Sequence, residues 1–126
     1  MTNGVLVNHH REDREYFFDE GCFINELLNT PQDSAVSIAR ARVAAGETTR
    51  WHRLQGITER YLIVSGQGTA SIGDEDIVLT AGDVVVIPAG VRQRIRNTGD
   101  EVLEFLAICT PRFVVGAYED LEEGIS

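Results

Sequence analysis

An all-β barrel is the fold that this sequence favours, on three observations. Short segments rich in apolar and β-branched residues recur from residue 34 onward, and turn residues separate them. Glycine or proline ends several of these segments, as expected where the chain reverses or a ladder donor is absent. The length of 126 residues and the hydrophobic share of 43% suit one domain with its own core. We therefore expect a single domain over residues 1–126, with a barrel core at about 35–111.

The strands of the core are expected, in order, at 36–43, 59–64, 69–72, 76–79, 84–87, 91–96 and 102–110. Gly73 and Asp74 separate two of them and predict a hairpin. Residues 1–34 form an N-terminal arm, in which 11–18 is a helical turn or an arm and 22–28 an extra strand. The acidic C-terminal tail covers 112–126, and its segment 118–123 is expected to be a short helix or mobile chain.

A first motif extends from Gly46 to Gly66. It resembles the first motif of the cupin superfamily: a glycine, five residues, His-x-His, four residues, a glutamate, six residues and a glycine. His52 and Glu59 occupy the first histidine and the glutamate positions, and every spacing is met. Leu54 stands where the family has its second histidine.

A second motif extends from Gly82 to Asn97. It is similar to the second cupin motif: a glycine, five residues, Pro-x-Gly, two residues, a histidine, three residues and an asparagine. Here Gln93 replaces the histidine, while Pro88 and every spacing are kept. The two motifs cover roughly half of the chain, and the resemblance implies a double-stranded β-helix, or jelly roll. Fold alone does not imply function.

Alternation along the strands indicates which of these side chains face the barrel interior. Glu59 and Tyr61 share one face, with Arg60 on the other, and Gln93 faces the cavity together with Ile95. Tyr61 is expected to line the pocket and to donate a proton or a hydrogen bond, the alternative being a packing role alone.

The resemblance implies a divalent metal held by the motif histidines and glutamate. Carried over by position, it implies a weakened site formed by His52, Glu59 and the Gln93 amide oxygen, for Mn, Fe, Ni or Zn. The alternative is that His52 and Glu59 are hydrogen-bonded in a metal-free cavity with Leu54 in its wall. Cys22 and Cys109 are expected to be buried free thiols.

These observations predict a cupin that binds a small molecule, as a metal-dependent isomerase, lyase or dioxygenase. The alternative is a non-enzymatic, metal-free barrel that binds or senses a ligand.

The net charge of −9 argues against nucleic acid or an anionic membrane as partner. No apolar run approaches the roughly 20 residues of a membrane helix, and the N-terminus lacks a signal-peptide pattern, so a cytoplasmic location is expected. Relatives of this type pair through exchanged N-terminal strands, so we expect a homodimer that uses the apolar arm around Phe17 and Phe18.

Overall fold

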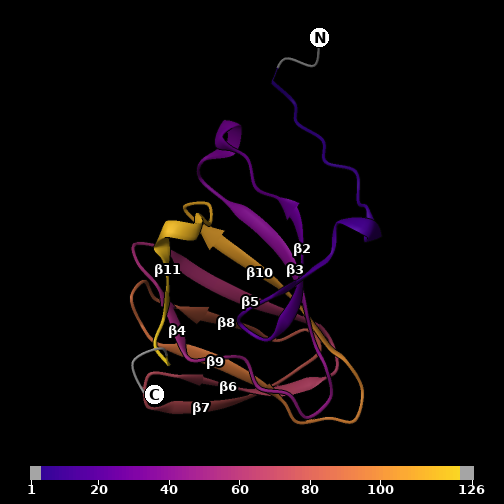
Figure 1. Ribbon diagram of the computed structural model, residues 1–126, viewed down its shortest axis with the longest axis vertical. Helices are drawn as coiled ribbons and strands as arrows, with labels where there is room; N and C mark the ends of the chain where they lie inside the picture. The colour runs from indigo at the N-terminus through magenta and orange to yellow at the C-terminus, as the bar shows by residue number, and fades with distance from the viewer. Residues whose placement is uncertain (1–3, 123–126) are drawn as a thin grey trace.

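The computed structural model describes residues 4–122 and has two antiparallel sheets packed face to face (Figure 1). The larger sheet contains, in spatial order, β1 (Tyr16–Phe18), β2 (Cys22–Leu28), β3 (Ser37–Val43), β10 (Leu103–Thr110), β5 (Thr58–Ser65) and β8 (Val84–Ile87). The smaller sheet contains β11 (Tyr118–Asp120), β4 (His52–Leu54), β9 (Gln93–Asn97), β6 (Gln67–Ile72) and β7 (Glu75–Thr80). Three short 3-10 helices complete the described chain: η1 (Glu12–Arg14), η2 (Pro31–Asp33) and η3 (Val115–Ala117). This is the jelly roll that the sequence predicts.

The core lies between the two sheets, and strand alternation decides which residues enter it. On β5 the buried residues are Glu59, Tyr61 and Ile63, while the residues between them are only partly buried. On β9 the interior positions are Gln93, Ile95 and Asn97. The predicted inward faces of both strands are therefore confirmed, and with them the convergence of motif residues on the barrel interior.

Two motif positions have a specific packing reason. Gly66 has φ 86°, and a Cβ there would lie 2.8 Å from the carbonyl oxygen of Val102, so only glycine fits. The buried Asn97 side chain donates to the carbonyl oxygens of Val43 (2.9 Å) and Glu101 (2.7 Å). These contacts fix the turn between β9 and β10 to the neighbouring sheet.

The ends of the described chain differ in part from the prediction. Residues 11–18 contain the predicted helical turn, η1, but continue as the edge strand β1. The tail begins with the short helix η3, yet the expectation of helix or mobile chain is wrong at 118–120, because β11 pairs with β4. Residues 123–126 lie outside the described residues.

The arginine face of β3 is covered by the chain's own arm. Arg40 contacts Glu12 at 2.8 Å and Glu15 at 3.1 Å, and Arg42 contacts Glu15 at 2.5 Å. The arm therefore gives both arginines intramolecular ion pairs. Within residues 4–122, no helix has the length and apolar character that crossing a membrane requires.

Candidate functional site

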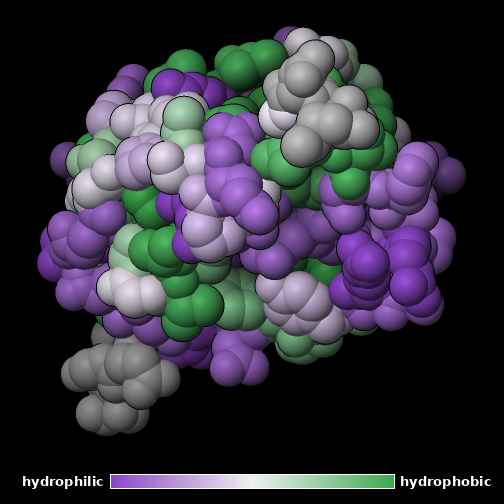
Figure 2. All heavy atoms as spheres, turned by 90° about the horizontal axis from the view of Figure 1, so that it is seen from above, coloured by the Kyte–Doolittle hydropathy of each residue, from purple (hydrophilic) through white to green (hydrophobic). Residues whose placement is uncertain are grey.

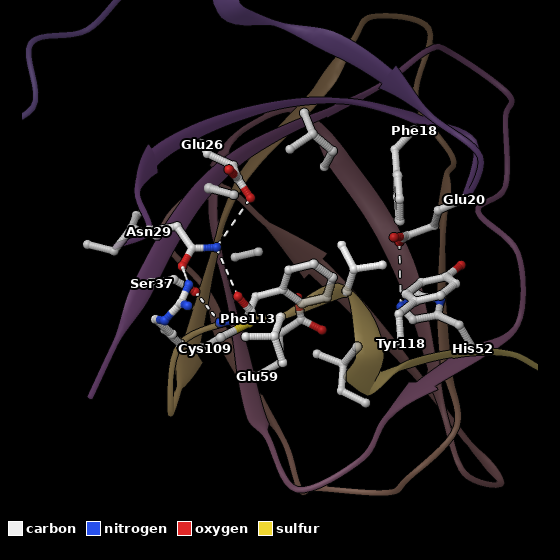
Figure 3. Close-up of a pocket in the computed structure, with 18 of the residues that line it drawn as sticks. Phe18, Glu20, Glu26, Asn29, Ser37, His52, Glu59, Cys109, Phe113 and Tyr118 are labelled. Atoms are coloured by element: carbon white, nitrogen blue, oxygen red, sulfur yellow. Dashed lines mark hydrogen bonds and ion pairs between the residues drawn. The ribbon is translucent and has the colours of Figure 1, made fainter. Parts of the chain in front are cut away.

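A pocket of about 450 Å³ lies inside the barrel and is lined by side chains from both sheets and from the segment around η3 (Figure 3). Apolar side chains make up much of its wall, including Leu54, as the sequence predicts for that position. Val114 and Val115 line it while being 44% and 76% exposed. Viewed from above, the surface of the molecule shows apolar side chains among hydrophilic ones (Figure 2). The pocket therefore suits a small organic molecule with both apolar and polar parts.

His52 is the imidazole of this pocket, and its tautomer follows from one hydrogen bond. Its Nδ1 lies 2.8 Å from the carbonyl oxygen of Arg50, which can only accept, so Nδ1 carries the proton. The ring is 2% exposed and stacks on Tyr118, with centroids 5.0 Å apart and planes 18° apart. Burial lowers the pKa of His52. At neutral pH the ring is therefore largely uncharged, with a lone pair at Nε2.

Glu20 is the carboxyl group nearest to that lone pair. It lies in the turn between β1 and β2, where its backbone oxygen accepts a hydrogen bond from the Arg50 amide at 2.8 Å. Its Oε1 lies 3.6 Å from Nε2 of His52, too far for a direct hydrogen bond but close enough for charges to interact. The side chain is only 13% exposed, and burial raises the pKa of Glu20 to about 8.

Glu59 is a second carboxyl group with a raised pKa. Burial, and to a lesser extent the charge of Glu20, raises the pKa of Glu59 to about 7, against opposing effects of His52 and of hydrogen bonds from Gln93 and Cys109. Its side chain lines the pocket, and the buried Oε1 has no hydrogen-bond partner among the described residues. An unpartnered, buried carboxyl oxygen is costly to ionise, which agrees with the raised pKa of Glu59.

Gln93 and Tyr61 form the polar layer behind Glu59. Gln93 lies opposite His52 in the pairing of β4 with β9, and its Oε1 accepts a hydrogen bond from the Tyr61 hydroxyl. Tyr61 is 1% exposed and packs on Phe105 with ring centroids 4.5 Å apart. The structure thus gives Tyr61 a hydrogen bond to Gln93, and its predicted contact with a ligand stays a prediction.

The predicted metal ligands can be tested against this arrangement. The structure brings His52, Glu59 and Gln93 together, but the Gln93 carbonyl oxygen is already engaged by Tyr61. Leu54 supplies no donor. Among residues 4–122, no group of three or more His, Cys, Asp and Glu side chains is placed to hold a metal ion. This donor set fits a divalent metal poorly, and metal binding at the three residues stays a prediction.

Several pocket residues lie outside the two motifs. Glu20 and Tyr118 come from the arm and the tail, and they reach His52 only through long-range strand pairing. Glu26 lines the pocket from β2. Cys109 also lines it, but burial raises the pKa of this thiol to about 12, so it stays protonated. Neither the arm nor the tail carries a local alternation or spacing that identifies these contacts.

Sequence comparison finds a matching family profile and similar proteins in other organisms. The family profile described as "Cupin domain" matches residues 39–109. An uncharacterised protein of Methanocaldococcus jannaschii is 27% identical over 124 residues, which cover 97% of each chain. An oxalate-binding protein of Thermotoga maritima is 36% identical over 70 residues, 56% of this chain and 58% of the relative.

Solved structures are similar over most of the chain. A Thermotoga maritima protein described as a predicted oxalate decarboxylase has a TM-score of 0.67 at 30% identity, covering 71% of this chain and 80% of its own. The Streptomyces nucleoside dehydratase Pac13 has a TM-score of 0.76 at 17% identity, covering 92% of both chains, a likeness that shows the fold alone. With the two motifs, the antiparallel double sheet and a family match over more than half of its length, this chain belongs to the cupin family.

Proposed function

We propose that this cupin binds a small organic molecule in the barrel pocket and transfers protons on it without a metal, as an isomerase or a lyase. One observation carries the proposal: a buried, uncharged imidazole and two carboxyl groups whose pKa values burial raises to about 7 and about 8 border the same pocket. Titratable groups whose pKa values are moved toward neutrality by burial are typical of acid–base catalysis. The Thermotoga maritima matches, a sequence named for oxalate binding and a structure described as a predicted oxalate decarboxylase, support a small-molecule ligand.

In this mechanism His52 acts as the base. Its Nε2 lone pair takes a proton from a carbon next to a carbonyl group of the ligand, and the hydrogen bond from Nδ1 to the Arg50 carbonyl oxygen stabilises the charged ring that forms. The Glu20 carboxyl group, 3.6 Å from Nε2, stabilises the same charge when it ionises. Stacking on Tyr118 keeps the ring in place.

Glu59 acts as the acid. It donates its proton from the carboxyl group that faces the pocket, either to the enol carbon, which gives an isomer, or to a departing hydroxyl group, which leaves as water and gives an alkene. Gln93, held by Tyr61, fixes the orientation of the Glu59 carboxyl group. The base must be uncharged and the acid protonated. We therefore expect a maximum rate below pH 7, with the alkaline limb near the Glu59 pKa of about 7 and the acid limb at the lowered pKa of His52.

Solvent deuterium exchange tests the proposal before the natural substrate is known. Chelator-treated protein is incubated in D2O with hydroxy acids, keto acids and sugars, and proton NMR follows the loss of signals from carbon-bound hydrogen. We expect exchange in at least one compound, with His52→Gln and Glu59→Gln each slower by about 100-fold or more. Glu75→Gln, the same chemical change on an exposed strand residue, is the matched control and keeps the rate. Exchange in no compound, or exchange that needs added metal, contradicts the proposal.

A second candidate is the weakened metal site at His52, Glu59 and Gln93. It is favoured by the buried Glu59 Oε1, which has no hydrogen-bond partner among the described residues, because a cation would satisfy that atom. Elemental analysis of protein purified without chelator distinguishes the two candidates. Mn, Fe, Ni or Zn at close to one ion per chain, lost in His52→Gln, supports the metal site, and a metal-free protein with exchange activity supports proton transfer without it.

A further inference from the structure

The pocket has a second polar end, away from His52 and Glu20. Figure 3 shows Asn29, Ser37 and Glu26 on one side of the pocket and Glu20, His52 and Tyr118 on the other. The rest of the lining includes many apolar side chains, among them Ile24, Ile38, Leu54 and Ala107. A ligand that fills this pocket therefore meets polar groups at both ends of a short carbon skeleton.

Arg112 supplies the positive charge at this second end. Among the residues described as lining this pocket, Arg112 is the one arginine. Its Nη1 donates to Oδ1 of Asn29 at 2.8 Å. Among the described residues, no carboxylate lies within ion-pair distance of its guanidinium, whereas Arg40, Arg42 and Arg53 are all paired with glutamates. A guanidinium has five N–H donors in a fork that matches a carboxylate. Most of these donors remain available to a ligand.

The segment that carries Arg112 is held firmly against the barrel. The Arg112 amide donates to the carbonyl oxygen of Ser34 at 3.1 Å, and the Phe113 amide donates to Oγ of Ser37 at 2.9 Å. The Phe113 carbonyl oxygen accepts from Nδ2 of Asn29 at 2.9 Å, so Asn29 ties both residues to the pocket wall. A cation presented by a fixed segment is pre-organised, which lowers the entropic cost of binding an anion.

The charges around this arginine favour a local, specific contact. The chain has a net charge of −9, which opposes unspecific binding of anions. Glu26 lies at the same end, largely exposed, and its Oε1 is 3.3 Å from Nδ2 of Asn29. A ligand at this end therefore meets Arg112 as donor to an anionic group and Glu26 as acceptor for a hydroxyl group.

We propose that Arg112 binds the carboxylate of the substrate, and that the substrate of this pocket is a small hydroxy or keto acid. The carboxylate pairs with the guanidinium at the Asn29 end, and the carbon skeleton crosses the apolar wall toward His52 and Glu59. The inference rests on the proposed function for the chemistry at the far end, but the carboxylate contact depends on Arg112 alone.

Equilibrium binding tests the contact independently of catalysis. The probes are lactate, malate and gluconate, each compared with its neutral amide, and calorimetry or thermal unfolding gives the affinities. We expect at least one acid to bind about tenfold or more tightly than its amide, because hydrogen bonds to a charged partner contribute more than neutral ones. Arg112→Gln, which can still bond to Asn29, abolishes this preference, and Arg112→Lys keeps part of it. Arg96→Gln, the same loss of charge on the exposed side of β9, is the matched control and keeps the preference.

The outcomes separate this inference from the proposed function. Glu59→Gln should lose deuterium exchange yet keep the preference for acids. Acids that bind through Arg112 without any exchange support the inference and contradict the proposed function. Deuterium exchange on neutral compounds at a rate that Arg112→Gln does not change supports the proposed function and contradicts the inference. Equal affinity for acids and amides, a preference that persists in Arg112→Gln, or no binding by any acid at millimolar concentration overturns the inference.

Discussion

Replacement of Glu59 by glutamine should make the protein more stable at alkaline pH. The glutamate is 8% exposed, and its pKa is raised from 4.5 to about 7, chiefly by burial. A carboxyl group with a raised folded-state pKa favours folding fully below its unfolded value, and this contribution is lost as the pH rises through the folded value. Glutamine has nearly the same volume and stays uncharged at every pH, so it avoids this loss.

The size of the effect follows from the two pKa values. At 1.36 kcal/mol for each pH unit, the gap between 4.5 and about 7 corresponds to about 3 kcal/mol. Below pH 4.5 the carboxyl group is protonated in both states, so this ionisation contributes no difference between the two proteins. Above pH 7 the variant should gain up to about 3 kcal/mol relative to the wild type. Glu20, with its own raised pKa of about 8, remains in both proteins, and the part of the Glu59 shift that its charge causes belongs to the penalty that the variant avoids.

Urea unfolding followed by the fluorescence of Trp51, the single tryptophan, measures this difference between pH 4.5 and pH 9. Glu75→Gln changes the same group on an exposed strand position and controls for the net charge. If Glu59→Gln and wild type show the same pH dependence of the free energy of unfolding, the Glu59 carboxyl group ionises without penalty and the reasoning fails.

Three further predictions address the site, the fold and the assembly. Leu54→His should tighten the binding of Ni or Zn by adding an imidazole to the pocket wall; calorimetry that shows unchanged affinity in a folded variant would place that side chain away from the site. Asn97→Ala should lower the free energy of unfolding by about 2 to 4 kcal/mol in urea, because the carbonyl oxygens of Val43 and Glu101 lose their donors, and a loss below about 1 kcal/mol would refute this. Light scattering should give a dimer of the 13.9 kDa chain, and a monomer mass at micromolar concentration would contradict the predicted pairing.

The barrel was predictable because its determinants are local. Gly66, Pro88 and Asn97 occur at fixed spacings where the chain turns, and period-two alternation placed Glu59 and Gln93 on inward faces. These features depend on neighbours in sequence, so most strands of the core and the inward-facing residues Glu59 and Gln93 could be identified without a structure, whereas the short strands β1, β4 and β11 were not predicted.

The electrostatics of the pocket were not predictable in the same way. Glu20 acts on His52 across 3.6 Å only because the arm turns back over β4, and Tyr118 reaches the ring only because β11 pairs with β4. In the sequence, Arg112 follows a proline and belongs to neither motif. Only the structure shows that it lines the pocket and contacts Asn29. Such contacts join segments that lie far apart in the chain, and no local spacing encodes them.

The proposed proton transfer depends most on the protonation of the two buried carboxyl groups, Glu59 and Glu20. Carbon-13 NMR of protein labelled at the glutamate side-chain carboxyls follows each group through a pH titration, with Glu20→Gln and Glu59→Gln to assign the signals. We predict titration of Glu59 near pH 7 and of Glu20 near pH 8. Titration of both groups near pH 4.5, the ordinary value for a glutamate, would contradict the account, because neither carboxyl group would then hold a proton to donate at neutral pH.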